Sequence, residues 1–178
     1  ISNEARNVVL RGHTDAWWAL DPDVVLLRGS GIDDDTAWTH VVASAMSGGN
    51  YLLGDGRQAS ATRLAMALGA DILALAREPT AARPSDAFAR TDPGPVLSPI
   101  VDPQGTGRVP HLFRKRGADA SREWLAVFAW DEEAYAPLVD LPSGAIEVLP
   151  DGSTRPAPGR GTKARVAVRT NGARLFRW

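Results

Sequence analysis

Trp124-Leu125-Ala126-Val127-Phe128-Ala129-Trp130 is the stretch of sequence that decides the fold. An extended strand directs alternate side chains to opposite faces, and here both alternating sets are apolar. A strand of this kind is buried on both sides, which predicts a central position in a sandwich or barrel. Further short strands are expected around it at 112–116, 135–141, 145–149, 163–169 and 173–178.

Turn-forming residues separate these expected strands. Pro142-Ser143-Gly144, Asp151-Gly152 and Asn171-Gly172 each lie between two of them. The Asn-Gly pair predicts a tight hairpin, because both residues tolerate the positive φ angles of such turns. About six short antiparallel strands over residues 111–178 therefore predict a small β-sandwich domain.

Residues 1–78 follow helical spacing instead. Apolar residues recur on one stripe between Asn3 and Leu20, and Pro22 ends this expected helix. Val24-Val25-Leu26-Leu27 is a short apolar run of the kind found in buried parallel strands. Tyr51 to Leu53 is another short apolar run, closed by Gly54-Asp55-Gly56.

Two further helical segments follow the first apolar run. Asp33-Asp34-Asp35 supplies an N-cap and acids for the first turn of one helix, and Gly48-Gly49 ends it. Its apolar stripe consists of Trp38, Val41, Val42, Ala45 and Met46. Helical spacing resumes at Leu64 and Leu68, breaks at Gly69, and continues through Ile72 and Leu75. The stripe would be exposed unless something covers it, and we expect cover from the rest of the polypeptide or from self-association.

A proline-rich segment separates the two halves. Seven of the 13 prolines lie between Glu78 and His111, which predicts an extended connection. The predicted organisation is thus an N-terminal part at 1–78, a connecting segment at 79–110 and the β-sandwich domain at 111–178.

Composition excludes several classes of protein. The chain has 178 residues, a net charge of −1, 44% hydrophobic residues and no cysteine, so disulfide frameworks, thiolate metal sites and thiol nucleophiles are excluded. No apolar run approaches the length of a membrane span, and no membrane partner is expected. There is no phosphate-binding glycine motif, and His13, His40 and His111 are scattered. We therefore expect no cofactor and no metal, and the compartment stays open.

The C-terminal segment is basic, with seven bases and no acid between 154 and 178. Such a segment can bind nucleic acid. However, Lys163, Arg165 and Arg169 alternate with apolar residues, which indicates the solvated face of a strand. No aromatic stacking platform accompanies the charges, and we favour the strand interpretation over a nucleic-acid partner.

Asp21-Pro22-Asp23 is the most informative acidic group. An acid beside a buried strand is costly unless it is paired, hydrogen-bonded or directed into a polar pocket. The alternative is a proline turn in which Asp21 or Asp23 caps backbone N–H groups. Arg28, at the far end of the apolar run, could pair with one of these acids or with a helix end.

The order of several segments resembles the C-terminal stretch of the melibiase-type α-galactosidases, which are retaining clan-D glycoside hydrolases. The segments are Asn3–Asn7, Trp17–Arg28 (WWALDPDVVLLR), Ser44–Asn50 with Leu52–Asp55, Ala82–Phe88 and Leu125–Trp130. The most specific element is the WW-x-x-D-P-D-x-x-L-L-R motif, followed about twenty residues later by SGG and GD. The resemblance covers nearly the whole chain.

The resemblance implies an α+β chain: the last helix–strand–helix part of a (β/α)8 barrel, followed by a small antiparallel β-sandwich. Family members hydrolyse terminal α-galactosides with two Asp residues, a nucleophile and an acid/base. Both lie on earlier barrel strands, so the resemblance implies that neither is in this chain and that the chain alone is inactive. Asp23 matches a family residue of the sugar pocket, whereas Arg28 matches a position with a structural role. Leu20 departs from the Asn that the family usually has before D-P-D.

The local residue pattern and the family resemblance place the strand near Asp23 at different residues. Local spacing begins it at Val24, which puts Asp23 at the amino end, the side of a barrel opposite to its active face. The resemblance requires the final barrel strand to lie at or before 19–22, with Val24 to Leu27 leading away from it. We expect the second arrangement, with a carbohydrate ligand at Asp23. Ile1 is then interpreted as a cut in a longer chain.

A second hypothesis is a non-catalytic module, in which the β-sandwich binds carbohydrate through exposed tryptophans or only braces the barrel. Burial of Trp124, Trp130 and Trp178 would argue against a tryptophan platform.

Overall fold

The computed structural model describes residues 24–29, 31–55, 59–86, 110–118, 120–130 and 135–178. The expected helix between Asn3 and Leu20, the expected strand at 19–22, and Asp21 and Asp23 lie outside these residues. The helices are α2 (Asp34–Met46), α3 (Ala61–Leu68) and α4 (Ala70–Arg77). The strands are β1 (Val24–Val25), β2 (Leu52–Leu53), β3 (Arg83–Pro84), β4 (Leu112–Arg116), β5 (Glu123–Phe128), β6 (Leu138–Leu141), β7 (Ile146–Val148), β8 (Thr154–Pro156), β9 (Thr162–Arg165) and β10 (Ala173–Arg177). None of the described helices has the length and apolar character needed to cross a membrane.

Strands β1 and β2 form a parallel pair connected through α2. Val24 lies opposite Leu52, and Val25 lies opposite Leu53. The local prediction of a parallel strand at Val24 and Val25 is therefore confirmed, and the described strand ends at Val25. Our expectation that Val24 to Leu27 lead away from the last barrel strand is wrong for Val24 and Val25, because both belong to a strand with a parallel neighbour. The described N-terminal part is strand–helix–strand followed by two helices, one strand more than the resemblance implied.

Helix α2 begins and ends as its sequence predicts. The Asp33 side chain accepts a hydrogen bond from the Thr36 N–H at 2.7 Å and caps the first turn. After the C-cap Ser47, Gly48 adopts a φ of +77°, and a Cβ there would lie 2.6 Å from the Thr80 carbonyl. Glycine is thus required both by the backbone angle and by the close approach of another segment.

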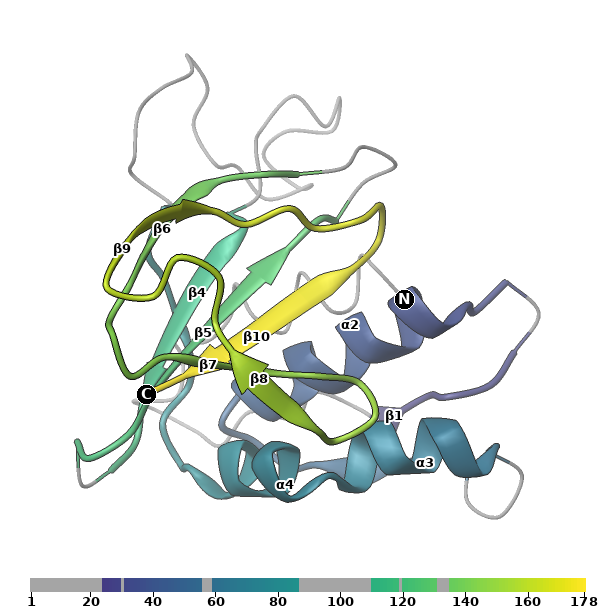
Figure 1. Cartoon of the computed structure of the whole chain (residues 1–178). Coiled ribbons are helices and arrows are strands. Elements are labelled where there is room, and N and C mark those ends of the chain that lie inside the picture. The colour runs from purple at the N-terminus through teal and green to yellow at the C-terminus, as the bar shows by residue number, and fades with distance from the viewer. Residues whose placement is uncertain (1–23, 30, 56–58, 87–109, 119, 131–134) are drawn as a thin grey trace, which may run out of the picture.

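The predicted apolar stripe of α2 is covered by this chain itself. Every residue from Ala37 to Met46 is buried, on all sides of the helix. Helix α2 contacts β1, α3 and α4 as well as β5 and β10, and α3 and α4 lie beside it in Figure 1. The break between α3 and α4 falls at Gly69, as predicted.

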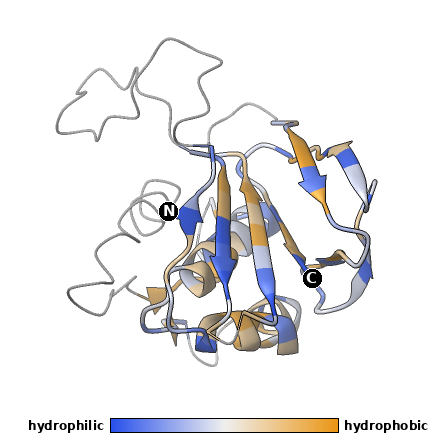
Figure 2. Ribbon diagram, turned by 90° about the vertical axis from the view of Figure 1, so that its left-hand side faces the viewer, coloured by the Kyte–Doolittle hydropathy of each residue, from blue (hydrophilic) through white to orange (hydrophobic). Residues whose placement is uncertain are grey.

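The main sheet has six antiparallel strands in the order β3-β4-β5-β10-β7-β8 (Figure 1). Strand β5 lies inside it, with Leu112 of β4 on one side of Val127 and Arg174 of β10 on the other. Its two faces enter different hydrophobic clusters, as its sequence predicts. Trp124, Ala126 and Phe128 pack in the cluster that includes the buried residues of α2 and α4, and Figure 2 shows hydrophobic residues along these strands and helices.

The opposite face of β5 is covered by a second, two-stranded sheet of β6 and β9. Leu125 and Val127 pack there with Val139 and Leu141 of β6. The described chain is therefore a mixed α/β structure with mostly antiparallel sheets, and its described residues form no closed barrel. The division at 78 and 110 remains a prediction.

One predicted hairpin is wrong. Asn171 has a φ of +54° and the Gly172 N–H donates to the Arg169 carbonyl at 2.9 Å, so a turn forms. However, β9 before this turn pairs with β6, while β10 after it pairs with β5 and β7. The turn passes the chain from one sheet to the other instead of closing a hairpin. Asp151-Gly152, in contrast, does connect two paired strands, β7 and β8.

Candidate functional site

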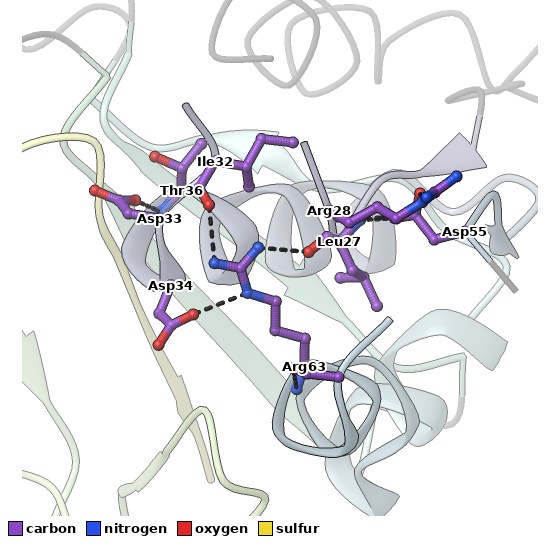
Figure 3. Close-up of polar contacts among 9 residues, drawn as sticks. Leu27, Arg28, Ile32, Asp33, Asp34, Thr36, Asp55 and Arg63 are labelled. Carbon is purple, nitrogen blue, oxygen red and sulfur yellow. Dashed lines mark hydrogen bonds and ion pairs between the residues drawn. The ribbon is translucent and has the colours of Figure 1, made fainter. Parts of the chain in front are cut away.

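The candidate site lies where β1 and β2 end. Because the strands are parallel, the residues that follow them, 26–28 and 54–55, lie at the same edge. Enzymes with parallel sheets carry their binding residues at this carboxyl edge. Two acids and two arginines organise it: Asp34, Asp55, Arg28 and Arg63 (Figure 3).

Asp55 joins the two strand ends. One of its oxygens accepts hydrogen bonds from the backbone N–H groups of Leu27 and Arg28, the latter at 2.9 Å. The other oxygen accepts from Arg28 Nε at 3.1 Å. Burial opposes the charge of Asp55, but these N–H groups outweigh it and hold the pKa of its carboxyl below the usual range. Asp55 is therefore a fixed carboxylate, and its side chain is only 7% exposed.

Arg63 holds the loop between β1 and α2. It lies on α3, whose N-cap Ser60 accepts a hydrogen bond from the Arg63 N–H. Its guanidinium donates to the Leu27 carbonyl at 2.6 Å and to the Ile32 carbonyl at 2.8 Å. Nε contacts Asp34 at 2.9 Å, and Figure 3 shows the guanidinium between Asp34 and Leu27. One side chain thus fixes both ends of the loop.

The three acids at 33–35 act as the sequence predicts, as helix-capping and first-turn residues. The hydrogen bond from Thr36 lowers the pKa of Asp33 below its ordinary value. Asp34 pairs with Arg63, and Asp35 lies 3.7 Å from Arg169 of the β-rich part. Among the residues that the structure describes, no group of three or more His, Asp or Glu side chains is placed to hold a metal ion.

Arg28 is the exposed member of the site. Its described ion pair is with Asp55, and the pair with Asp21 or Asp23 that the sequence suggested lies outside the described residues. The Arg28 side chain is 55% exposed. Within the described part of the chain, its two terminal amino groups, Nη1 and Nη2, have no hydrogen-bond partner. Asp23, the predicted sugar-pocket residue, lies outside the described residues, immediately before the first residue of β1.

The described histidines lie apart. His40 is buried in α2, where its Nδ1 lies 3.3 Å from the Leu26 N–H. His111 lies 2.8 Å from the Phe128 carbonyl through Nδ1 and stacks on Tyr135 with ring centroids 4.2 Å apart. His13 is outside the described residues.

The tryptophans of the β-rich part do not form an exposed platform. Trp124 and Trp130 are 0% and 1% exposed. Trp178 is half-buried, and the Arg114 guanidinium lies 5.3 Å from the centre of its ring. These positions argue against sugar binding by stacking on tryptophan.

Four of the seven bases in the C-terminal segment have ion pairs among the described residues: Arg155, Arg169, Arg174 and Arg177. The Glu147 carboxylate, buried in β7, binds Arg155 at 2.8 Å and Arg174 at 2.6 Å. Burial raises the pKa of Glu147, but the two guanidinium groups outweigh it, and the net shift is downward. Arg177 pairs with Asp71 of α4 at 2.6 Å. These pairs support the strand interpretation of the segment.

Sequence reasoning missed Asp55 and Arg63 as site residues. Asp55 carries a usable signal, because an acid directly after a buried apolar run marks the end of a strand. The sequence around Arg63 gives no such signal, because the partners of its side chain lie 29 to 36 residues away in the sequence.

The chain shares its fold with a C-terminal-like portion of solved α-galactosidase-type glycoside hydrolases, and the structural comparisons agree with the resemblance seen in the sequence. A Bacteroides fragilis protein provisionally assigned as an α-galactosidase/melibiase superposes with a TM-score of 0.70 and 14% identity, over 97% of this chain and 38% of that chain. Alpha-galactosidase I from Mortierella vinacea superposes with a TM-score of 0.59 and 14% identity, over 88% of this chain and 38% of that chain. A GH27 β-L-arabinopyranosidase from Geobacillus stearothermophilus superposes with a TM-score of 0.67 and 10% identity, over 99% of this chain and 42% of that chain.

The chain thus spans about two fifths of the solved structures it matches. At these identities the likeness establishes the fold. No family model and no curated protein matches the sequence.

Proposed function

We propose that this chain forms the C-terminal part of the barrel, together with the following β-sandwich, of a retaining glycoside hydrolase that acts on terminal α-galactosides. The observation that carries the proposal is the superposition of 97% of the chain on 38% of an α-galactosidase-type protein. The segment order quoted from the sequence supports it independently.

In the proposed enzyme this chain binds and positions the sugar, and other parts of the protein carry the reaction. A retaining mechanism needs a carboxylate nucleophile that forms a covalent glycosyl–enzyme intermediate. It also needs a second carboxyl group that protonates the leaving oxygen and then activates water. We assign neither role to a residue of this chain. Asp23 is proposed to accept hydrogen bonds from sugar hydroxyls.

The proposed partner is the remainder of the same polypeptide, with self-association as the other possibility. A two-stranded sheet is marginal on its own in water, and β1 and β2 pair only with each other among the described strands. Leu52 of β2 is 51% exposed. Additional parallel strands beside β1 and β2 would cover this surface. A well-folded, monodisperse 19 kDa monomer in light scattering would contradict the need for a partner.

The test of function is hydrolysis of a panel of p-nitrophenyl α-glycosides by the full-length protein that carries this chain. We expect release from the α-galactoside and none from the 178-residue chain alone. An intact full-length protein that cleaves no α-glycoside would refute the proposal.

The test of Asp23 is the substitution Asp23→Ala, with Asp140→Ala as the matched control, because Asp140 is an exposed acid on β6. We expect Asp23→Ala to lower turnover and Asp140→Ala to leave it unchanged. Equal turnover in the two variants would remove Asp23 from the sugar pocket.

The alternative of a sugar-binding module loses its main support, because Trp124 and Trp130 are buried. A bracing role for the β-rich part is compatible with the enzyme proposal, since one hydrophobic cluster contains residues of α2, β5 and β10.

A further inference from the structure

We infer that Arg28 is a substrate-binding residue that donates hydrogen bonds to hydroxyl groups of a neutral sugar. This inference deepens the proposed function and rests on it. It follows from three observations on the described residues: the position of Arg28, the way Asp55 orients it, and the charge around it.

The first observation is position. Arg28 follows the carboxyl end of β1, and Asp55 follows the carboxyl end of the parallel neighbour β2. Loops at this edge carry the binding residues of parallel α/β enzymes. The described direction of β1 therefore places Arg28 at the binding edge.

The second observation is orientation. Arg28 uses Nε for Asp55 Oδ1, and the backbone N–H of the same residue donates to Asp55 Oδ2. The buried carboxylate of Asp55 therefore holds both the backbone and the side chain of Arg28. The two terminal amino groups remain available on a side chain that is 55% exposed. A guanidinium held in this way presents a fixed pair of donors, which matches two adjacent acceptors on a ligand.

The third observation is charge. Asp55 neutralises Arg28, Arg63 pairs with Asp34, and two further acids of the 33–35 group lie on the same loop and helix start. Arg169 lies beside Asp35, so the described residues of the edge carry four carboxylates against three guanidinium groups. A carboxylate or phosphate on the substrate would meet net repulsion. Neighbouring hydroxyls of a neutral hexose accept the same hydrogen bonds without that cost.

The test uses the full-length protein with Arg28→Ala, Arg28→Lys and the control Arg160→Ala, an exposed arginine of the β-rich part. Galactose and galacturonate binding are measured by calorimetry, and KM and kcat with p-nitrophenyl α-galactoside. Loss of two hydrogen bonds from a charged donor predicts about tenfold weaker galactose binding and higher KM for Arg28→Ala. We expect kcat to stay within about threefold of wild type. Arg28→Lys should recover only part of the affinity, because lysine keeps the positive charge but lacks the paired donors of the planar guanidinium.

Each outcome decides a separate point. If Arg28→Ala binds galactose within twofold of wild type while keeping the thermal midpoint of the control, Arg28 is not a substrate residue, and the proposed function is untouched. Tighter binding of galacturonate than of galactose, lost in Arg28→Ala, overturns the neutral-sugar assignment. Galactose binding that depends on Arg28 without hydrolysis of any α-glycoside refutes the enzyme proposal and retains this one. A wild-type protein that neither binds nor hydrolyses refutes both.

Discussion

Lys115 predicts an unusual dependence of stability on pH. It lies on β4, is 1% exposed, and donates a hydrogen bond from Nζ to the Ala45 carbonyl of α2 at 3.1 Å. Burial lowers its pKa from 10.5 to about 7, although the nearby Glu78 carboxylate acts in the opposite direction. Between these two pH values the unfolded chain binds a proton that the folded chain does not. Stability should therefore rise with pH, by about 2 kcal/mol between pH 7 and pH 9.

The assay is urea unfolding of wild type and Lys115→Met at pH 7, 8 and 9, with free energies from linear extrapolation. All other titrations are common to both proteins, so the difference between their free energies isolates Lys115. We expect wild type to gain about 2 kcal/mol relative to Lys115→Met over this range. Lys163→Met, at the exposed second lysine of the chain, serves as the control and should run parallel to wild type.

A constant difference between wild type and Lys115→Met from pH 7 to pH 9 would refute the reasoning. It would mean that Lys115 keeps its ordinary pKa in the folded state, and hence that water reaches the junction between α2 and β4. A difference that falls with pH would contradict the sign of the argument as well.

Three further predictions concern stability and are checked by the same unfolding assay. Asp33→Ala removes the N-cap of α2 and should cost about 1 kcal/mol, whereas an unchanged stability would mean that another group caps the helix. Gly48→Ala should cost more than about 1–2 kcal/mol, because its φ is +77° and its Cβ would meet the Thr80 carbonyl; a neutral effect would show that this segment moves freely. Phe128→Ala should lower the free energy of unfolding by about 3–5 kcal/mol, because the Phe128 side chain is fully buried. Leu138→Ala, at a residue that is 61% exposed, should change it by no more than about 0.5 kcal/mol. Equal losses in the two variants would contradict the assignment of the core.

The features that could be predicted from the sequence are those that depend on neighbouring residues. The N-cap of α2 and the break at Gly69 are set within one helical turn, and both were predictable. The two apolar faces of β5 could also be read from alternation alone. The pairing of β9 with β6 could not be predicted, because an Asn-Gly turn has the same sequence whether it closes a hairpin or connects two sheets. Strands β3 and β8 each contain a proline, which conceals short edge strands from pattern reasoning.

For the candidate site, too, only contacts between residues close in the sequence could be predicted. The acids at 33–35 were correctly interpreted as a helix start, because Asp33 binds a group three residues away. Asp55 binds groups 27 and 28 residues away, and its role depends on the parallel pairing of two strands of two residues each. That pairing also sets the direction of β1, and direction decides which end of the strand faces a ligand. Arg28 follows the carboxyl end of the described strand, whereas the resemblance implies that Asp23 lies in the sugar pocket, so a mutational comparison of these two residues would show which of them binds the sugar.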